Sequence, residues 1–201
     1  MILPDLKEYR RVFESKGVSY PLPIVPVATE GLLSKLPPCP DDQTGWPWTE
    51  QTDPAVYKGC TTWPKLTIVT PSYNQGQFIE QTIRSVLLQN YPNLEYIFID
   101  GGSTDQTLEI LKKYSSWISY WQSEKDQGQS QAINLGFSLA SGHYYAWINS
   151  DDYYLENVFG RVIDVFLDTR SKFVYGFGYN YRVDTRKLEL VKIMPFRDFF
   201  I

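Results

Sequence analysis

From residue 65 onward, short apolar runs alternate with segments in which apolar residues recur at helical spacing. The runs are rich in β-branched and aromatic residues, which favours strands, whereas spacings of three and four positions favour amphipathic helices. The predicted strands are Leu66–Thr70, Leu94–Asp100, Ile118–Gln122 and Tyr144–Ile148, and the predicted helices are Phe78–Leu88, Ser103–Tyr114, Ser130–Leu139 and Val158–Phe166. Because parallel strands need helical crossovers, this alternation predicts an α/β fold with a mostly parallel sheet flanked by helices.

Two further features are predicted at the margins of this pattern. Ser103 and Gln106 have the spacing of a capping box, which would open the second helix of the series. Lys172–Tyr179 and Leu188–Met194 are predicted as two later strands, joined as a hairpin around Asp184-Thr185.

Residues 1–64 follow a different pattern, because recurring prolines interrupt every candidate helix except a short one at Leu6–Ser15. The stretch GWPWTEQTDP, residues 45–54, indicates a strap laid over the following domain with its two indoles as anchors. A binding role for the indoles is the alternative. We therefore expect a Pro- and Trp-rich extension at 1–64 and a main domain at 65–201.

Composition and net charge exclude several classes of function and indicate the compartment. The net charge of −4 and the absence of a Lys/Arg run argue against a nucleic-acid binder. Cys39 and Cys60 show no CxxC spacing and are expected to be reduced thiols, and the single His143 excludes a His-rich metal site. With no 18-residue apolar span and no signal-peptide layout, a cytoplasmic protein is expected.

Polar and acidic residues follow each of the four predicted strands. In an open α/β sheet ligands bind at the carboxyl ends of the strands, so polar residues at all four ends predict a binding site there. The four segments are PSYNQG (71–76), DGGSTD (100–105), EKDQG (124–128) and NSDD (149–152).

The residue types at these ends indicate the ligand chemistry. Gly101-Gly102 allows a flat ligand to approach closely, the carboxylate of Asp100 suits an imide N–H or a ribose hydroxyl, and Tyr73 offers a face for a base. The adjacent acids Asp151 and Asp152 would repel phosphate, so a diphosphate requires a cation between them. Hard oxygen ligands favour Mg²⁺ or Mn²⁺. The site is therefore predicted to hold a nucleoside diphosphate without a GKS/T loop.

Each motif also has a purely structural interpretation. DGGSTD alone is as compatible with a turn plus helix cap as with a binding site, and NSDD alone is more often a turn than a metal site. Asp105 is better explained as a first-turn helix acid than as a ligand. Glu124 and Asp126 are as compatible with a solvated loop pair as with a binding site. The joint arrangement favours a site.

Four other nucleotide- or phosphate-handling classes fit less well. A phosphoryl-accepting receiver or an aspartate-dependent phosphatase would place an acid after the first strand, where this chain has TPSYN. A sugar nucleotidyltransferase would carry a Gly-rich, Arg-containing loop there, and a dinucleotide-binding dehydrogenase would carry GxGxxG; neither is present.

The segments TIVTPSYNQGQFIEQTIRSVLLQNYPNLEYIFIDGGSTD and SEKDQGQSQAINLGFSLASGHYYAWINSDD, in this order and spacing, resemble a family 2 glycosyltransferase with the GT-A (Rossmann-like) fold. The resemblance runs from about Leu66 to about Val158, and GWPWTEQ is similar to an N-terminal extension of some bacterial members. It implies an inverting transferase that uses a nucleotide-activated sugar, usually a UDP-sugar, with Mn²⁺ or Mg²⁺.

The resemblance also implies roles for individual residues. Asp151 is implied as the metal ligand with Asp152 in support, while Asn149 stands where many members have the first Asp of Asp-x-Asp and can hydrogen-bond the ribose. Gln131 stands where relatives often carry Asp. The implied donor-binding residues are Pro71, Ser72, Tyr73, Asp100, Gly101, Gly102, Asp126, Gly128, Gln129, Asn149 and Ser150.

The transferase interpretation leaves the catalytic base unassigned, and it has one rival. In the family the catalytic base lies well downstream of the fourth strand, so it is expected beyond Ile201, and neither Glu156 nor Asp184 is assigned to it. The rival is a catalytically silent nucleotide-sugar or glycan-binding module. The expected acceptor is a glycan, a lipid-linked glycan or a protein in cell-wall or polysaccharide synthesis, which allows association with the inner face of the membrane. The sugar and the oligomeric state stay open.

Overall fold

The computed structural model describes residues 11, 30–58, 63–182, 184–185 and 187–191 of the chain. The chain forms two compact units, Met1–Gly160 and Arg161–Ile201. Residues 30–58 therefore fall in the same unit as the sheet, a different division from the boundary expected between residues 64 and 65. Cys60 and, apart from Arg11, the helix predicted at Leu6–Ser15 lie outside the described residues.

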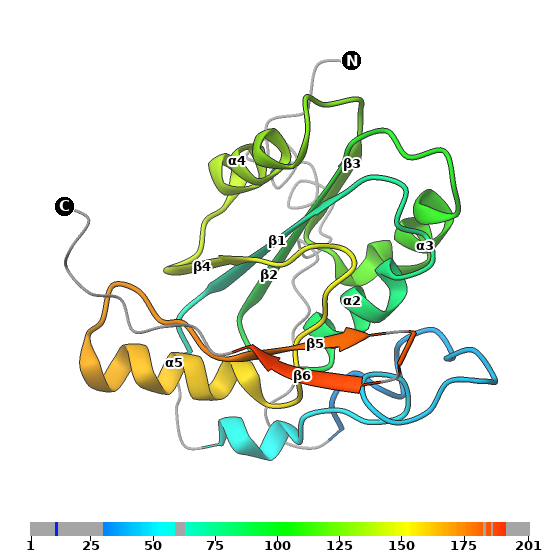
Figure 1. Ribbon diagram of the computed structural model, residues 1–201. Coiled ribbons are helices and arrows are strands. Elements are labelled where there is room, and N and C mark those ends of the chain that lie inside the picture. Colours follow the sequence, from blue (N-terminus) through cyan, green and yellow to red (C-terminus); the bar gives the residue numbers. More distant parts are fainter. Residues whose placement is uncertain (1–10, 12–29, 59–62, 183, 186, 192–201) are drawn as a thin grey trace. The chain divides into compact units, whose positions relative to one another are not determined.

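The first unit is built on a four-stranded, fully parallel sheet in the order β3-β2-β1-β4 (Figure 1). The predicted α/β fold with helices flanking a parallel sheet is confirmed. Its elements in chain order are η1 Pro54–Tyr57, β1 Leu66–Ser72, α2 Ile79–Leu87, β2 Leu94–Asp100, α3 Thr107–Tyr114, η2 Ser115–Trp117, β3 Tyr120–Ser123, α4 Gln129–Leu139 and β4 Tyr144–Trp147. Helix α5, Val158–Thr169, begins in this unit and belongs mostly to the second.

The strand order explains where the helices lie. The chain moves outward from β1 to β2 and β3 and then returns past β1 to β4, and right-handed crossovers place α4 on the opposite face from α2 and α3 (Figure 1). The direction of winding therefore changes between β1 and β4, and such a reversal opens a crevice at the carboxyl ends of the strands. At Gly136 a Cβ would overlap the Val69 side chain, so α4 packs directly on β1.

The two central strands form the core of the sheet. Every residue of β1 and β2 is buried, which matches their near-continuous apolar sequences, whereas β4 at the sheet edge alternates between half-buried and exposed residues. Two polar pairs lie inside the core: the Thr70 hydroxyl lies 3.0 Å from the Tyr96 hydroxyl, and Thr67 Oγ1 donates to Glu95 Oε2 at 2.8 Å.

The capping box predicted at Ser103 and Gln106 is wrong. Helix α3 begins at Thr107, four residues later than predicted, and the N-cap residue Gln106 makes no side-chain cap hydrogen bond. Instead, Asp105 Oδ1 accepts from the N–H of Thr107 at 3.0 Å. Ser103 is not available for capping because its hydroxyl bonds to Asp100 and Asn74.

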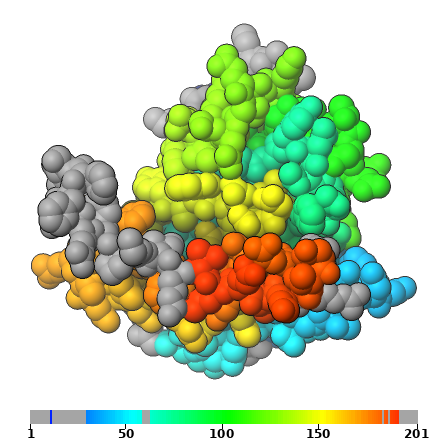
Figure 2. Space-filling model, viewed as in Figure 1, coloured from blue at the N-terminus to red at the C-terminus, as the bar shows by residue number. Residues whose placement is uncertain are grey.

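The second unit contains a hairpin of β5 Gly178–Arg182 and β6 Lys187–Val191, paired antiparallel with Arg182 opposite Lys187. The hairpin is therefore confirmed, but residues 172–177 of the first predicted strand form no strand, and its pairing begins at Gly178. Every residue of β5 and β6 is exposed (Figure 2). None of the helices among the described residues has the length and apolar character needed to cross a bilayer.

Arg84 of α2 ties the N-terminal strap to the sheet unit. Its side chain is buried, with 1% of its surface exposed. The guanidinium donates to the carbonyl oxygens of Pro37, Pro47 and Trp48 at 2.7–3.0 Å and to the Tyr114 hydroxyl at 3.0 Å. A buried charge is tolerated only when its donors are satisfied. Two of these four acceptors, Pro47 and Trp48, come from the strap, and a third, Pro37, comes from the Pro-rich segment before it.

The two indoles of the strap act as anchors, in agreement with that interpretation of the sequence. Trp46 Nε1 donates to the Tyr154 carbonyl oxygen at 2.7 Å. The Trp48 ring lies under the Arg84 guanidinium, with 5.5 Å between the ring centroid and Cζ.

We predict that Arg84→Met lowers the free energy of unfolding by about 3 kcal/mol, because the strap carbonyls lose their donor and stay buried. Urea denaturation followed by tryptophan fluorescence measures the change. The exposed Arg161 of α5 provides the matched control, since Arg161→Met removes the same charge from a solvated position. Equal stability of the two variants would contradict the assigned role.

Candidate functional site

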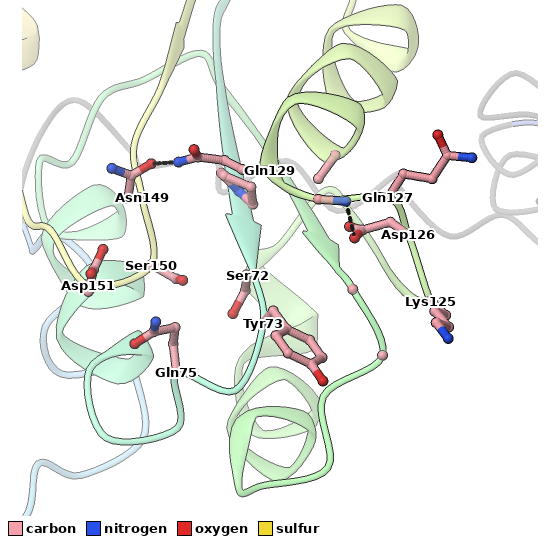
Figure 3. Close-up of a pocket in the computed structure, with 15 residues that line it drawn as sticks. Ser72, Tyr73, Gln75, Lys125, Asp126, Gln127, Gln129, Asn149, Ser150 and Asp151 are labelled. Carbon is pink, nitrogen blue, oxygen red and sulfur yellow. Dashed lines mark hydrogen bonds between the residues drawn. The ribbon is translucent and has the colours of Figure 1, made fainter.

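A cavity of about 740 Å³ lies at the carboxyl ends of the four parallel strands (Figure 3). Its volume is in the range of small-molecule sites. It is lined by residues from all four strand ends, so the sheet topology brings together the segments that the sequence predicts to meet. The predicted site residues that line it are Pro71, Ser72, Tyr73, Gly101, Gly102, Asp126, Gly128, Gln129, Asn149, Ser150 and Asp151.

Some lining residues are absent from the predicted set, and two predicted ones are absent from the lining. Gln75, Lys125 and Gln127 stand in the polar loops that the sequence singles out, so a wider selection within those loops would include them. Ala132, in the first turn of α4, carries no polar signal. Asp100 and Asp152 do not line the cavity.

Asp100 is buried beneath the turn that lines the cavity, and its contact with a base or ribose stays a prediction. Its side chain is 0% exposed. The carboxylate accepts from the N–H groups of Gly102 and Ser103 at 3.1 and 2.9 Å, and from the hydroxyls of Ser103 and Ser123. Four protein donors satisfy the carboxylate in place of water or ligand. Asp100 thus shapes the Gly101-Gly102 turn that lines the cavity.

The loops after β1 and β2 are fastened to each other. The N–H of Asn74 donates to Ser103 Oγ at 2.8 Å, and Asn74 Oδ1 accepts from the N–H of Thr104 at 2.8 Å. Asp105 accepts from the N–H of Gly76 at 2.8 Å as well as from Thr107. Desolvation opposes the shift, but these hydrogen bonds hold the pKa of Asp105 below its ordinary value. Asp105 therefore acts in the loop and at the helix start, and it does not line the cavity.

Tyr73 and Ser72 offer two different groups to a ligand (Figure 3). The Tyr73 side chain is 60% exposed, which leaves its ring face available for stacking. Ser72 is buried, and no described group hydrogen-bonds its Oγ. A buried hydroxyl without a partner is rare in folded proteins, and one in a cavity lining is available to a bound molecule.

Asp126 forms the far wall of the cavity beside Gly101. Its Oδ1 accepts from the N–H of Gly128 at 2.9 Å. A Cβ at position 101 would lie 3.1 Å from both Asp126 carboxylate oxygens, so glycine lets the carboxylate lie directly against the β2–α3 turn. Asp126 can accept a further hydrogen bond from a ligand N–H or hydroxyl.

An amide chain joins the α4 side of the cavity to the β4 side (Figure 3). Gln129 Nε2 donates to Asn149 Oδ1 at 2.6 Å, and Asn149 Nδ2 donates to Asp152 Oδ2 at 3.1 Å. Partial burial raises the pKa of the Asp152 carboxyl above its ordinary value; the hydrogen bond from Asn149 opposes this shift, and the charge of Asp151 adds to it. Asp152 is thus engaged with Asn149, and its role toward a metal stays a prediction.

Asp151 is the lining carboxylate suited to a divalent cation at the β4 end. Among the described residues, no three His, Cys, Asp or Glu side chains gather into a metal-binding group. Mg²⁺ and Mn²⁺ sites nevertheless often use one or two carboxylates and complete their shell with substrate phosphates and water. Asp151 together with a diphosphate fits that donor set, whereas zinc, which prefers nitrogen and sulfur ligands, does not.

The charges of the lining are mixed. Asp126 and Asp151 contribute two carboxylates and Lys125 one ammonium group. Helix α4 starts at the cavity and has no acidic residue in its first turn, so its positive end faces the space. The lining therefore carries Lys125, Asp126 and the N-terminus of α4 on one side, and the carboxylate of Asp151 on the β4 side.

Comparison with known proteins decides the family. Residues 67–200, two thirds of the chain, match the model of Glycosyl transferase family 2. The chain belongs to this family. The resemblance inferred from the sequence is confirmed, and the cavity lies within the matched residues.

Family 2 relatives match the chain over part of their length. An uncharacterized glycosyltransferase of Rickettsia typhi is 32% identical over 134 residues, which are 66% of this chain and 41% of the relative. TuaG of Bacillus subtilis, a glycosyltransferase whose name assigns it provisionally to teichuronic acid biosynthesis, is 33% identical over 119 residues, 57% of this chain and 47% of TuaG. The matched part thus spans less than half of each relative.

Among solved structures, residues 1–349 of Staphylococcus aureus TarS in complex with UDP-GlcNAc are similar to this chain with a TM-score of 0.46 and 26% identity. The similarity covers 52% of this chain and 31% of TarS.

We predict that Asp100→Asn destabilises this family 2 domain by about 3 kcal/mol. Asparagine replaces one carboxylate oxygen with an NH₂ group, which would then face N–H or O–H groups that are themselves donors. The change in the free energy of unfolding is measured by urea denaturation. Asp164→Asn, at an exposed position of α5, is the matched control and is expected to be nearly neutral. A neutral Asp100→Asn would show that the four hydrogen bonds do not hold the turn.

We predict a pH-dependent effect of Asp152→Asn without divalent cations. A raised pKa means that folded Asp152 binds its proton more tightly than the unfolded chain does, so wild-type stability declines as pH rises through that pKa. Asparagine removes the titration and keeps an oxygen for Asn149 Nδ2. The variant's melting temperature relative to wild type should therefore rise from acidic to neutral pH. A pH-independent difference would contradict the assignment.

Proposed function

We propose that the chain carries the donor-binding part of a glycosyltransferase, that its donor is a nucleoside-diphosphate sugar with UDP as the nucleotide, and that Mn²⁺ or Mg²⁺ is required. The observation that carries the proposal is the placement of Asp151 at one side of a cavity whose other walls include Tyr73, Gly101 and Asp126. A base-binding end and a carboxylate are thus present in one space of nucleotide-sugar size.

The nucleobase end is assigned to Tyr73, Asp126 and Gly101. The exposed Tyr73 ring can stack on a base, and Gly101 lets a flat ring approach the turn. The Asp126 carboxylate accepts hydrogen bonds, so it favours a base edge that carries an N–H, such as the imide of uracil. The Ser72 hydroxyl supplies a further polar contact.

The diphosphate end is assigned to the region between the start of α4 and Asp151. Phosphate oxygens are favoured by the N-terminal end of α4 and by Lys125, but Asp151 repels them. A bound divalent cation would remove this repulsion and stabilise the diphosphate as a leaving group. Asn149 and Ser150, beside Asp151, are placed to hydrogen-bond the ribose or the sugar.

The reaction proposed is direct displacement with inversion at the anomeric carbon, in which an acceptor hydroxyl attacks from the face opposite the diphosphate. We assign no base among the described residues. The name of TuaG supports an acceptor in cell-wall polysaccharide synthesis, which would place the protein in the cytoplasm at the inner face of the membrane.

We predict that UDP together with Mn²⁺ raises the melting temperature by several degrees, since a ligand at about a hundred times its Kd stabilises the folded state by about 2.7 kcal/mol. Asp151→Ala and EDTA should each remove this shift. Asp164→Ala, which deletes an exposed carboxylate of α5, should retain it.

The same thermal-shift measurement with GDP- and TDP-sugars tests the choice of nucleotide. Transfer or hydrolysis of a radiolabelled UDP-sugar then separates an active transferase from a silent binding module. A shift that survives both Asp151→Ala and EDTA would sink the metal assignment, and the lack of any nucleotide-dependent shift would sink the proposed function.

A further inference from the structure

The segment that follows β4 has no helix or strand of its own until α5 begins, yet its backbone is held at many points. Residues 149–152 form a turn in which the N–H of Asp152 donates to the Asn149 carbonyl oxygen at 3.2 Å. Asp151 stands within this turn with an exposed side chain. What fixes the turn therefore fixes the direction of the Asp151 carboxylate.

Polar side chains on and just after α2 supply the partners of this backbone. Thr82, Ser85 and Gln89 are spaced three and four positions apart, so they lie along one side of the helix. Ser85 Oγ accepts from the N–H of Tyr154 at 3.2 Å, and Gln89 Nε2 donates to the Leu155 carbonyl oxygen at 2.8 Å. All three polar side chains are buried.

Thr82 contacts the part of the segment that carries Asp151. Its Oγ1 lies 2.9 Å from the Ser150 carbonyl oxygen and 2.7 Å from the Asp152 carbonyl oxygen. A hydroxyl has one proton to donate, so the two carbonyls share it. These carbonyls belong to the residues directly before and after Asp151, and the hydroxyl thereby ties both flanks of that residue to α2.

We infer that Thr82 is a positioning residue for Asp151, a role that rests on the proposed function. Thr82 itself does not line the cavity; it acts by holding the turn that carries the lining residues Ser150 and Asp151. Mg²⁺ and Mn²⁺ demand well-placed oxygen ligands, and a shift of the turn would displace Asp151, the lining carboxylate at the β4 end. Groups that orient metal ligands in this way commonly matter for metal affinity.

The decisive variant is Thr82→Val, which keeps the shape of the side chain and removes the hydroxyl. We expect the affinity for UDP in the presence of Mn²⁺ to fall about tenfold, the lower end of the range for residues that orient metal ligands. Thr82→Ser keeps the hydroxyl and should restore the affinity. Isothermal titration of UDP into protein, with saturating Mn²⁺ and separately with EDTA, measures the effect.

The matched control is Thr67→Val, near the start of β1, at the end of the strand that lies away from the cavity. Thr67 is also buried and also loses one hydrogen bond, to Glu95, but lies away from the turn. It should lower stability without changing the Mn²⁺-dependent affinity. Thr82→Ala serves as a second test of the hydroxyl should valine prevent folding, because alanine adds no methyl group against the two carbonyls.

The outcomes distinguish this inference from the proposed function. Wild-type affinity in the Thr82 variants overturns the positioning role alone. The same conclusion follows if Thr67→Val loses as much affinity as Thr82→Val, or if Thr82→Val weakens UDP binding equally with Mn²⁺ and with EDTA. A wild-type protein that binds no UDP under either condition overturns the proposed function itself.

Discussion

The buried carboxylate of Asp100 is the interaction on which the arrangement of the cavity depends. It stands at the end of β2 and accepts hydrogen bonds from the turn that follows and from Ser123 at the end of β3. Through Ser103 it also reaches Asn74, in the loop after β1. One charge, satisfied by protein donors alone, thus joins the carboxyl ends of three strands. The sheet brings these ends near each other, and the carboxylate fixes the loops that leave them.

The fourth strand end is fixed by a different element. The turn at Asn149–Asp152 is bound from one side by Thr82 of α2 and linked across the cavity by the amides of Asn149 and Gln129. The position of Asp151, just after β4, therefore depends on α2, the helix that connects β1 to β2. This division separates the two ends of the cavity: the wall that carries Gly101 and Gly102 is organised by Asp100, and the wall that carries Asp151 is organised by α2. A change in one wall can leave the other intact.

The sequence predicts the fold and the place of the cavity well, because both follow from local patterns. Apolar runs and helical spacing define the elements, and parallel strands carry their polar loops to one edge. The errors arise where a long-range partner decides the outcome. Ser103 resembles a helix cap until Asp100 and Asn74 recruit its hydroxyl. The burial of Asp100 has no local signal either, because one of its donors is Ser123, on the next strand of the sheet. Thr82 carries no local signal at all, since its importance comes from carbonyls sixty-eight and seventy residues away.

Arg84 shows that the part of the chain that matches the family model does not contain all the residues that pack around its own core. The family match begins at residue 67, yet three of the groups that solvate this buried guanidinium lie between Pro37 and Trp48. A fragment trimmed to the family border would lack the three carbonyl oxygens that take the place of water around this cation. The proline-interrupted part of the sequence therefore supplies acceptors that the regular part needs once its arginine is buried.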